Sequence, residues 1–304
     1  MFAENKSENM GNYTIGVDIG GSHISSCLVN LQDKSILEES IKSQKINSQD
    51  SAQRILEQWV CCLKSTISSI NETPVGIGFS FPGPFDYEKG VSLVEGVNKF
   101  DKLFGLDLTS SLISRFRRMK ISNFRYVNDA GAFAIGEAFA GVVKNHKRVM
   151  ALTLGTGLGS GFVVNGQLIT TGESVPPNGW VYNLTFEDTI ADNSFSTRWF
   201  CNRYEALTGM RIEGVREIAE KIGTDIYSKQ VFEEYGYRLG SFIIPVYTRF
   251  KGDIIVLGGN ISKAYPLFKE SLLQRIREEG LDMPISVSSL QDNAAMLGAG
   301  LLFI

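Results

Sequence analysis

The chain has 304 residues, of which 43% are hydrophobic and 21% charged, a composition typical of globular proteins. At about 150 residues per domain, this length suggests two domains. The net charge of −3 and the pI near 5.6 give no electrostatic basis for binding nucleic acid or an anionic membrane. No apolar run reaches the roughly 18 residues that span a bilayer. The four cysteines, Cys27, Cys61, Cys62 and Cys201, include no CxxC pair, so we expect a reduced, cytoplasmic protein.

The N-terminal part of the chain predicts a β-meander interrupted by glycine. Residues 1–11 are polar and predict a disordered tail. Tyr13–Ile19 is short, β-prone and apolar at alternate positions, and further apolar runs follow at Ile24–Leu31 and Ile36–Ile41. Gly20-Gly21-Ser22 separates the first run from the second. The pattern therefore predicts three antiparallel strands.

The same pattern returns in the middle of the chain. Arg148–Leu154 predicts a strand, Gly155–Gly159 a break, and Ser160–Val164 the next strand. Asn165-Gly166 is a strong hairpin signal, because a type I′ turn needs positive φ at both central positions. Gln167–Thr171 is the third run. The repeat indicates a duplicated architecture with two similar lobes.

Apolar stripes at helical spacing and two further strands are predicted in the rest of the chain. Val75–Phe81 and Asp253–Leu257 predict strands that end at Pro82-Gly83-Pro84 and at Gly258-Gly259-Asn260. In layered α/β proteins ligands bind at the carboxyl ends of strands, where glycine lets a ligand approach the backbone. Ser51 can cap the first helix. Apolar residues at helical spacing are interpreted as core packing and not as sites. They form four stripes: Ile55, Trp59, Leu63 and Ile67; Leu108, Leu112 and Phe116; positions within Val231–Phe250; and Leu267, Leu272 and Ile276.

Two glycine turns are candidate phosphate sites. Asp18 is followed by Gly20-Gly21-Ser22, and successive amides in such a turn can converge on an anion. Because a carboxylate repels phosphate, Asp18 would act through Mg²⁺ or a water on Mg²⁺. Gly155–Gly159 has the same character, but it lacks the P-loop lysine and opens no helix. Each turn alone is also compatible with an ordinary hairpin, whereas the pair could hold one polyphosphate from two sides.

Asn128-Asp129 stands where a strand ends and a helix begins. Both residues are good helix caps, which is one interpretation. In the other, Asp129 is a general base that accepts the proton of an attacking hydroxyl, as phosphoryl transfer from ATP to an alcohol requires. Asn128 would then hydrogen-bond a neighbouring hydroxyl of the acceptor.

These motifs together resemble the ROK family (repressors, open reading frames and sugar kinases) of the actin- and hexokinase-like ATPase superfamily. The resemblance runs from about Tyr13 to the C-terminus. The superfamily's five motifs occur in order: Asp18–Ser22 as first phosphate motif, Val127–Glu137 as first connecting helix, Leu154–Gly161 as second phosphate motif, Leu257–Asn260 as adenosine motif and Asp292–Gly300 as second connecting helix.

The resemblance implies an α/β fold of two actin/ribonuclease H-like lobes around an interlobe cleft. It implies an N-terminal lobe at 12–127 plus 292–304 and a C-terminal lobe at 128–291. It further implies ATP and Mg²⁺ as cofactors, with the metal near Asp18, and Asp129 as the catalytic base. The implied sugar-binding residues are Asn98, Asn128, Gly83 and Glu187, and the implied nucleotide-binding residues are Asp18, Gly20, Gly21, Ser22, Gly155, Thr156, Gly157, Gly159, Gly258, Gly259 and Asn260.

The chain departs from the family pattern at the sugar and zinc motifs. Where the family usually has Glu-x-Gly-His, this chain reads Pro177-Asn178-Gly179-Trp180, and the cysteine-rich zinc motif is missing. We therefore predict no structural zinc. The only histidines are His23 and His146, and His23 occupies a position where the family commonly has lysine. Trp180 would stack on a sugar face or close the pocket, and the sequence leaves both open.

The resemblance favours an ATP-dependent kinase of a hexose or N-acetylhexosamine. The lost glutamate and histidine keep open a catalytically weak sugar- or nucleotide-binding protein. A transcriptional regulator is less favoured, because the first phosphate motif starts near residue 13 and leaves no room for a helix-turn-helix domain. No nucleic-acid or membrane partner is expected. A homodimer stays open, since family members are often dimers or tetramers.

Overall fold

The computed structural model describes residues 11–96 and 99–304. The disordered tail predicted for the N-terminus lies outside this part except for Gly11, and so does Asn98. Contacts divide the chain into two units, of which unit 1 runs to Asp129 and includes Ala295–Ile304, and unit 2 is Ala130–Ala294. Within the described residues, no helix combines the length and apolarity needed to cross a membrane.

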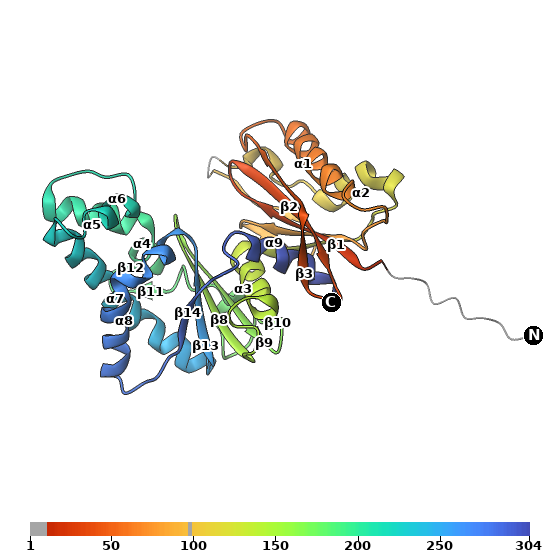
Figure 1. The fold of residues 1–304 in the computed structure, drawn as a ribbon. Coiled ribbons are helices and arrows are strands. Elements are labelled where there is room, and N and C mark those ends of the chain that lie inside the picture. Colours follow the sequence, from red (N-terminus) through yellow and green to blue (C-terminus); the bar gives the residue numbers. More distant parts are fainter. Residues whose placement is uncertain (1–10, 97–98) are drawn as a thin grey trace, which may run out of the picture. The chain divides into compact units, whose positions relative to one another are not determined.

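Unit 1 is built on a five-stranded sheet in the order β3-β2-β1-β4-β7, of which Figure 1 labels β1, β2 and β3. β1 (Tyr13–Ile19), β2 (His23–Asn30) and β3 (Ser35–Lys45) are antiparallel, which confirms the predicted meander, although β3 is longer than predicted. β4 (Ile77–Phe81) and β7 (Phe124–Asn128) run parallel to β1. The carboxyl ends of these three parallel strands therefore lie at one edge of the sheet.

Helix α1 (Ala52–Ile67) lies along one face of this sheet (Figure 1). It begins after Ser51, whose hydroxyl accepts a hydrogen bond from the Arg54 amide at 3.4 Å, as the capping signal predicts. Trp59 of α1 is fully buried, with ring contacts to the strand residue Phe79. The remaining elements up to β7 are β5 (Phe85–Asp86), β6 (Val91–Ser92), α2 (Leu108–Phe116) and two short 3₁₀ helices (Asp101–Leu103 and Arg117–Met119).

Helix α9 (Asn293–Gly300) packs on the other face of the sheet, at positions where the strands carry glycine. Successive strand residues point to opposite faces, so Phe79 faces α1 and Gly78 faces away from it. A Cβ built on Gly78 would lie 1.9 Å from the Ala299 carbonyl oxygen, and one on Gly16 would lie 1.9 Å from the Met296 carbonyl oxygen. Only glycine lets the backbone of the helix approach the two paired strands this closely. A 3₁₀ turn (Leu301–Phe303) ends the chain.

Unit 2 repeats the same topology, with a five-stranded sheet in the order β10-β9-β8-β13-β14. β8 (Arg148–Leu154), β9 (Leu158–Val164) and β10 (Gln167–Leu168) are antiparallel. β13 (Ile254–Gly258) and β14 (Ile285–Val287) run parallel to β8. The duplication predicted from the two glycine-interrupted meanders is therefore confirmed, although β10 is shorter than the predicted third run.

The second glycine break is shorter than predicted, because Gly159 lies inside β9. It pairs with Thr153 of β8. A Cβ on Gly159 would lie 2.3 Å from Thr153 Oγ1 and 2.8 Å from the Ala130 methyl group, and one on Gly161 would lie 2.5 Å from the Ala134 methyl group. These glycines lie where helix α3 (Asp129–Ala140) crosses β9 at close range. The glycines of this motif thus serve two purposes, a turn at its start and helix packing at its end.

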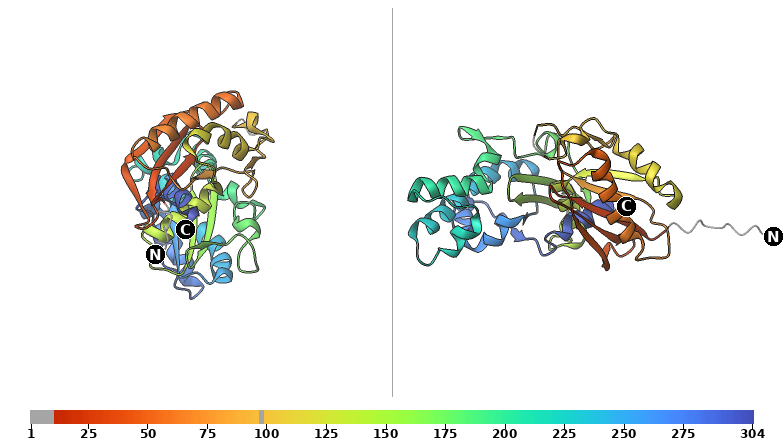
Figure 2. Two further views of the ribbon diagram at one scale, coloured as in Figure 1. Left: turned by 90° about the vertical axis from the view of Figure 1, so that its right-hand side faces the viewer. Right: turned by 90° about the horizontal axis from the view of Figure 1, so that it is seen from above.

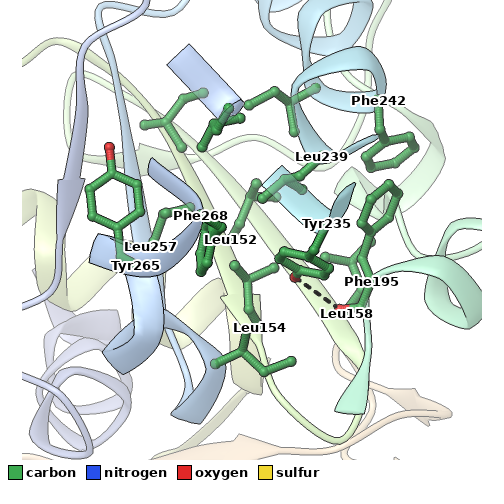
Figure 3. Packing of buried hydrophobic residues seen from close by; sticks show 14 of the residues in the cluster. Leu152, Leu154, Leu158, Phe195, Tyr235, Leu239, Phe242, Leu257, Tyr265 and Phe268 are labelled. Atoms are coloured by element: carbon green, nitrogen blue, oxygen red, sulfur yellow. Dashed lines mark hydrogen bonds between the residues drawn. The ribbon is translucent and has the colours of Figure 1, made fainter. Parts of the chain in front are cut away.

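The larger core of unit 2 lies between its sheet and a helical layer. α7 (Ile226–Phe250) and α8 (Tyr265–Glu278) run side by side (Figures 1 and 2). Figure 3 shows Leu152 and Leu257 of the sheet packed near Phe195, Tyr235 and Phe268, with the Tyr235 hydroxyl donating to the Phe195 carbonyl at 3.5 Å. The other elements are α4 (Ala191–Ser194), α5 (Thr197–Thr208), α6 (Val215–Glu220), the β11–β12 hairpin (Thr185–Phe186 and Thr189–Ile190) and two 3₁₀ helices (Pro177–Gly179 and Asn260–Ala264).

Candidate functional site

The parallel strands of unit 1 bring three predicted segments to one sheet edge. The register pairs Asp18 with Ser80, and Phe81 with Asn128. Asp18 therefore lies one residue before the end of β1, near the end of β4, and Asp129 begins α3 directly after β7. The strand-end arrangement expected for a ligand site is present in this unit.

Tyr87 connects the strand ends around the predicted sugar residues. Its hydroxyl donates to the Phe81 carbonyl at 3.0 Å and accepts a hydrogen bond from Asn128 Nδ2 at 3.1 Å. A Cβ on Gly83 would lie 3.4 Å from the same hydroxyl oxygen. Tyr87 thus holds the Asn128 amide beside the Gly83 turn. The sequence analysis missed Tyr87, since it lies between two very short strands and belongs to no motif.

Asp18 is oriented by Ser80, whose hydroxyl donates to Asp18 Oδ1 at 2.8 Å. An oriented carboxylate is the ligand type that Mg²⁺ prefers, and Mg²⁺ commonly takes one or two carboxylates together with substrate phosphates and water. No group of three or more His, Cys, Asp or Glu side chains suited to a metal occurs among residues 11–96 and 99–304. Asp18 therefore fits a magnesium ion carried by phosphates better than an all-protein metal site.

Asp129 is an exposed side chain on the first residue of α3. At a helix N-terminus the aligned peptide dipoles stabilise a carboxylate, which favours the ionised form that a general base needs. The same position also suits a capping residue. The structure thus accommodates both interpretations made from the sequence, and the catalytic role stays a prediction.

The second candidate phosphate turn, which begins at Gly155, lies in unit 2. Hydrogen bonds to neighbouring residues support it on one side, and its other side is open. The Thr197 amide and hydroxyl both donate to the Gly155 carbonyl, at 2.8 and 3.0 Å, and Asp192 Oδ1 accepts from the Leu158 amide at 2.8 Å. A Cβ on Gly155 would meet no described atom within 4 Å, whereas one on Gly157 would lie 2.8 Å from Asp192 Oδ1. The open side at Gly155, next to the exposed Thr156, offers space for an anion.

Gly258 and Gly259 are packed against protein. A Cβ on Gly258 would lie 2.4 Å from the Phe133 ring, and one on Gly259, where φ is +80°, would lie 2.4 Å from the Leu154 carbonyl oxygen. The absence of a side chain at both positions therefore lets β13 end beside β8. A pocket opens next to them within unit 2, and it is lined by Gly258, Gly259, Asn260, Ser262, Lys263, Val287, Ser288, Gln291 and Asp292.

A buried carboxyl group supports one wall of this pocket. The Ser288 hydroxyl donates to Glu137 Oε1 at 2.5 Å and accepts from the Gln291 amide at 2.8 Å. Glu137 is fully buried, and its Oε2 makes no hydrogen bond of normal geometry among the described residues. Burial raises the pKa of Glu137 above its usual 4.5, although the Ser288 hydrogen bond opposes the shift.

Replacing Glu137 with glutamine is expected to change how stability depends on pH. Because the folded-state pKa is raised, the wild type loses stability as the pH rises above the unfolded pKa, toward the folded one. Glutamine does not titrate, so the unfolding free energy of Glu137→Gln should rise relative to wild type as the pH rises above the unfolded-state pKa of about 4.5. Urea denaturation at several pH values measures this difference. The exposed Glu72→Gln variant is the matched control, and a pH-independent difference for Glu137→Gln would contradict the expectation.

Glu187 forms an ion pair in unit 2. It lies in the β11–β12 hairpin with φ of +51°, and its carboxylate accepts from Arg238 Nη1 at 2.8 Å. The Arg238 guanidinium also lies over the rings of Phe186 and Trp199, 5.2 and 5.6 Å from their centroids. The carboxylate is still half exposed. Its predicted contact with sugar stays a prediction, because the ion pair alone explains its position.

The segment that replaces the family's sugar motif is fixed to β9. Ser160 donates to the Gly179 carbonyl at 2.6 Å and accepts from the Val181 amide at 3.0 Å. Trp180, between them, is half-buried, and its ring centroid lies 5.8 Å from that of Tyr182. The indole is therefore held in a defined place even though the expected glutamate and histidine are absent from this stretch.

Two sheets with the same strand order, each carrying glycine turns and polar residues at its strand ends, define the actin-like ATPase fold. The sequence profile of the ROK family matches residues 14–178 and 186–304, and the chain belongs to this family.

Among curated relatives, the glucokinase of Thermotoga maritima is 27% identical, over 94% of this chain and 95% of the relative. The N-acetyl-D-glucosamine kinase of Haemophilus influenzae is 25% identical, over 95% of this chain and 98% of the relative. The xylose repressor of Bacillus subtilis is 22% identical, over 96% of this chain and 77% of the relative. Both kinases and repressors are therefore similar to this chain at low identity.

Solved structures show the same fold. The ROK hexokinase of Thermus thermophilus superposes with a TM-score of 0.79 at 19% identity, covering 95% of this chain and 97% of that one. A ROK glucokinase of Streptomyces griseus, solved with glucose and AMPPNP, superposes with a TM-score of 0.72 at 20% identity, covering 95% of this chain and 98% of that one. Both structures therefore share the fold of this chain.

Proposed function

We propose that this protein is an ATP-dependent kinase that phosphorylates a hexose or an N-acetylhexosamine. The observation that carries the proposal is the convergence of Asp18, the Gly83 turn, Asn128 and Asp129 at one edge of the unit 1 sheet. A general base, an orienting amide and a metal-binding carboxylate are the groups that phosphoryl transfer to an alcohol needs. Relatives named glucokinase and N-acetyl-D-glucosamine kinase support the substrate class.

In the proposed reaction, Asp129 accepts the proton of one sugar hydroxyl. The oxygen of that hydroxyl forms a bond to the γ-phosphorus of ATP, while the bond from this phosphorus to the bridging oxygen breaks and ADP leaves. Asn128, held by Tyr87, orients the sugar through a neighbouring hydroxyl. Magnesium, carried by the phosphates near Asp18, would neutralise charge on them. Gly83, Asn98 and Glu187 are the further proposed sugar contacts.

We propose the nucleotide contacts in the same way. The adenosine would occupy the pocket beside Asn260, where Lys263 and Ser262 supply polar groups. The phosphates would reach the open side of the Gly155 turn. The complete set proposed for the nucleotide is Asp18, Gly20, Gly21, Ser22, Gly155, Thr156, Gly157, Gly159, Gly258, Gly259 and Asn260. Gly159 would act indirectly, because it lies within β9.

A protein that binds sugar or nucleotide with little turnover is the second candidate. The observation that favours it is the Pro177–Trp180 segment, which offers no carboxylate or imidazole for sugar hydroxyls. Each missing hydrogen bond would cost about 1–3 kcal/mol, which is roughly tenfold to a hundredfold in affinity. Trp180 could replace part of this energy by stacking on a sugar ring.

A coupled assay of ADP release over a panel of sugars separates the two candidates. The panel holds glucose, mannose, N-acetylglucosamine, N-acetylmannosamine and xylose, each with ATP and Mg²⁺. We expect at least one hexose or N-acetylhexosamine to stimulate ADP release well above the rate without sugar. The melting temperature is measured with the same sugars. A sugar that raises the melting temperature and leaves ADP release unchanged would favour the binding protein over the kinase.

A further inference from the structure

Lysine 99 lies against the first glycine turn of unit 1. A Cβ built on Gly21 would lie 3.0 Å from Lys99 Cε and 3.4 Å from its Nζ, so the side chain occupies the face that Gly21 leaves bare. The neighbouring Gly20 is covered in the same way, since a Cβ there would lie 2.6 Å from Cε1 of the His23 ring. An ammonium and an imidazole therefore flank two consecutive glycines of the turn.

A third basic residue lies next to this turn. Lys45 of β3 pairs with His23 of β2, and directly opposed residues in an antiparallel pair project to the same face. The Ile46 amide donates to the Ser22 carbonyl at 2.9 Å, which ties the end of β3 to the turn. The three basic side chains come from three separate segments of the chain.

These basic side chains have no acidic partner among residues 11–96 and 99–304. Neither Lys45 nor Lys99 forms an ion pair with a described carboxylate, while other lysines such as Lys89 and Lys229 do. The acidic group of the same turn, Asp18, receives the Ser80 hydroxyl. Holding a lysine side chain against the backbone costs rotamer entropy. Two lysines beside a glycine turn, neither of them in an ion pair with a described carboxylate, suit an anion from solution.

We propose that Lys99 binds the terminal phosphate group of the phosphoryl donor, with Lys45 adding to the positive field around it. The ligand class is a condensed phosphate anion. The inference rests on the proposed kinase function and adds to it a residue that no motif identifies. An ammonium at this turn would offset negative charge on the transferred group, and such charge stabilisation is often the largest contribution to catalysis.

Binding of sodium tripolyphosphate tests the inference without any sugar. Calorimetric titration at low salt compares wild type, Lys99→Met, Lys99→Arg and Lys102→Met. Lys102 is an exposed lysine three positions away, and its variant removes the same charge outside the turn. We expect Lys99→Met to raise the Kd about tenfold, the scale of one lost charge-assisted hydrogen bond. Lys99→Arg should stay within about threefold of wild type and Lys102→Met within about twofold.

Kinetics with the best sugar of the panel provide the second readout. Lys99→Met should lower kcat about tenfold or more and leave the KM for sugar unchanged, because the lost contact is to the phosphate. The inference is overturned if Lys99→Met binds tripolyphosphate like wild type, if Lys102→Met weakens binding equally, or if wild type binds none. Lysine-dependent binding in a protein that phosphorylates no sugar would support the anion site and reject the kinase function.

Discussion

Replacing Asp129 with asparagine is expected to lower kcat for sugar phosphorylation by about 10²–10⁴-fold, the usual contribution of a general base. Asparagine has nearly the same size but cannot accept the hydroxyl proton at neutral pH. It is also a good residue for a helix start, so α3 should still begin at this position. The substitution therefore separates the two interpretations of Asp129, since a purely capping role predicts little change in rate.

The measurement combines steady-state kinetics with a binding control. The Kd for ADP and the melting temperature of Asp129→Asn should stay close to those of wild type, which locates the loss in the chemical step. Asp33→Asn, in the exposed turn between β2 and β3, is the matched control and should keep full activity. An Asp129→Asn variant that retains more than about a tenth of the wild-type kcat would refute the assignment as general base.

Replacing Gly78 with alanine is expected to destabilise unit 1 by about 3 kcal/mol or more, the upper end for overpacked cores. The added methyl group would lie 1.9 Å from the carbonyl oxygen of Ala299. This neighbour is helix backbone and cannot rotate aside, so α9 must shift as a whole or leave the sheet. The lower conformational entropy of an unfolded alanine chain offsets only about 0.4–1 kcal/mol of this cost.

Urea denaturation of wild type and of four variants measures this effect. Gly16→Ala should be destabilised on the same scale, because its methyl group would meet the Met296 carbonyl oxygen at 1.9 Å. The double variant should lose less than the sum of the two, since one displacement of α9 relieves both clashes. Gly223→Ala is the control, with no described atom within 4 Å of the added carbon. Equal stability of Gly78→Ala and Gly223→Ala would contradict the packing argument.

Local signals in the sequence were sufficient for several elements. Ser51 predicted the start of α1 because its hydroxyl satisfies an amide only three residues away. Asn165-Gly166 predicted the β9–β10 turn because positive φ at two consecutive positions is a local requirement, and the structure has φ of 50° and 82° there. The two glycine-interrupted meanders predicted the duplication, since alternating apolar residues and breaks repeat in the same order.

The glycines beyond these turns could not be interpreted from the sequence. Gly159 was predicted in the turn and lies within β9, while Gly258 and Gly259 pack against Phe133 and Leu154. In a single sequence, a glycine that a turn requires cannot be distinguished from one that makes room for a ligand or for a neighbouring helix. Only the identity of the atom facing its Cα separates these cases.

The sequence by itself determined the repeated three-stranded meander and the position of Asp129 at a strand-to-helix junction, because each depends on residues close together in the chain. It also indicated the family, through the order of five such local motifs. The tertiary structure decided which side chains surround those motifs. Ser80 on Asp18, Tyr87 on Asn128 and Lys99 against Gly21 all join segments more than 40 residues apart, with separations of 62, 41 and 78. Such contacts arise from strand register and loop paths, and neither leaves a pattern in the neighbouring residues.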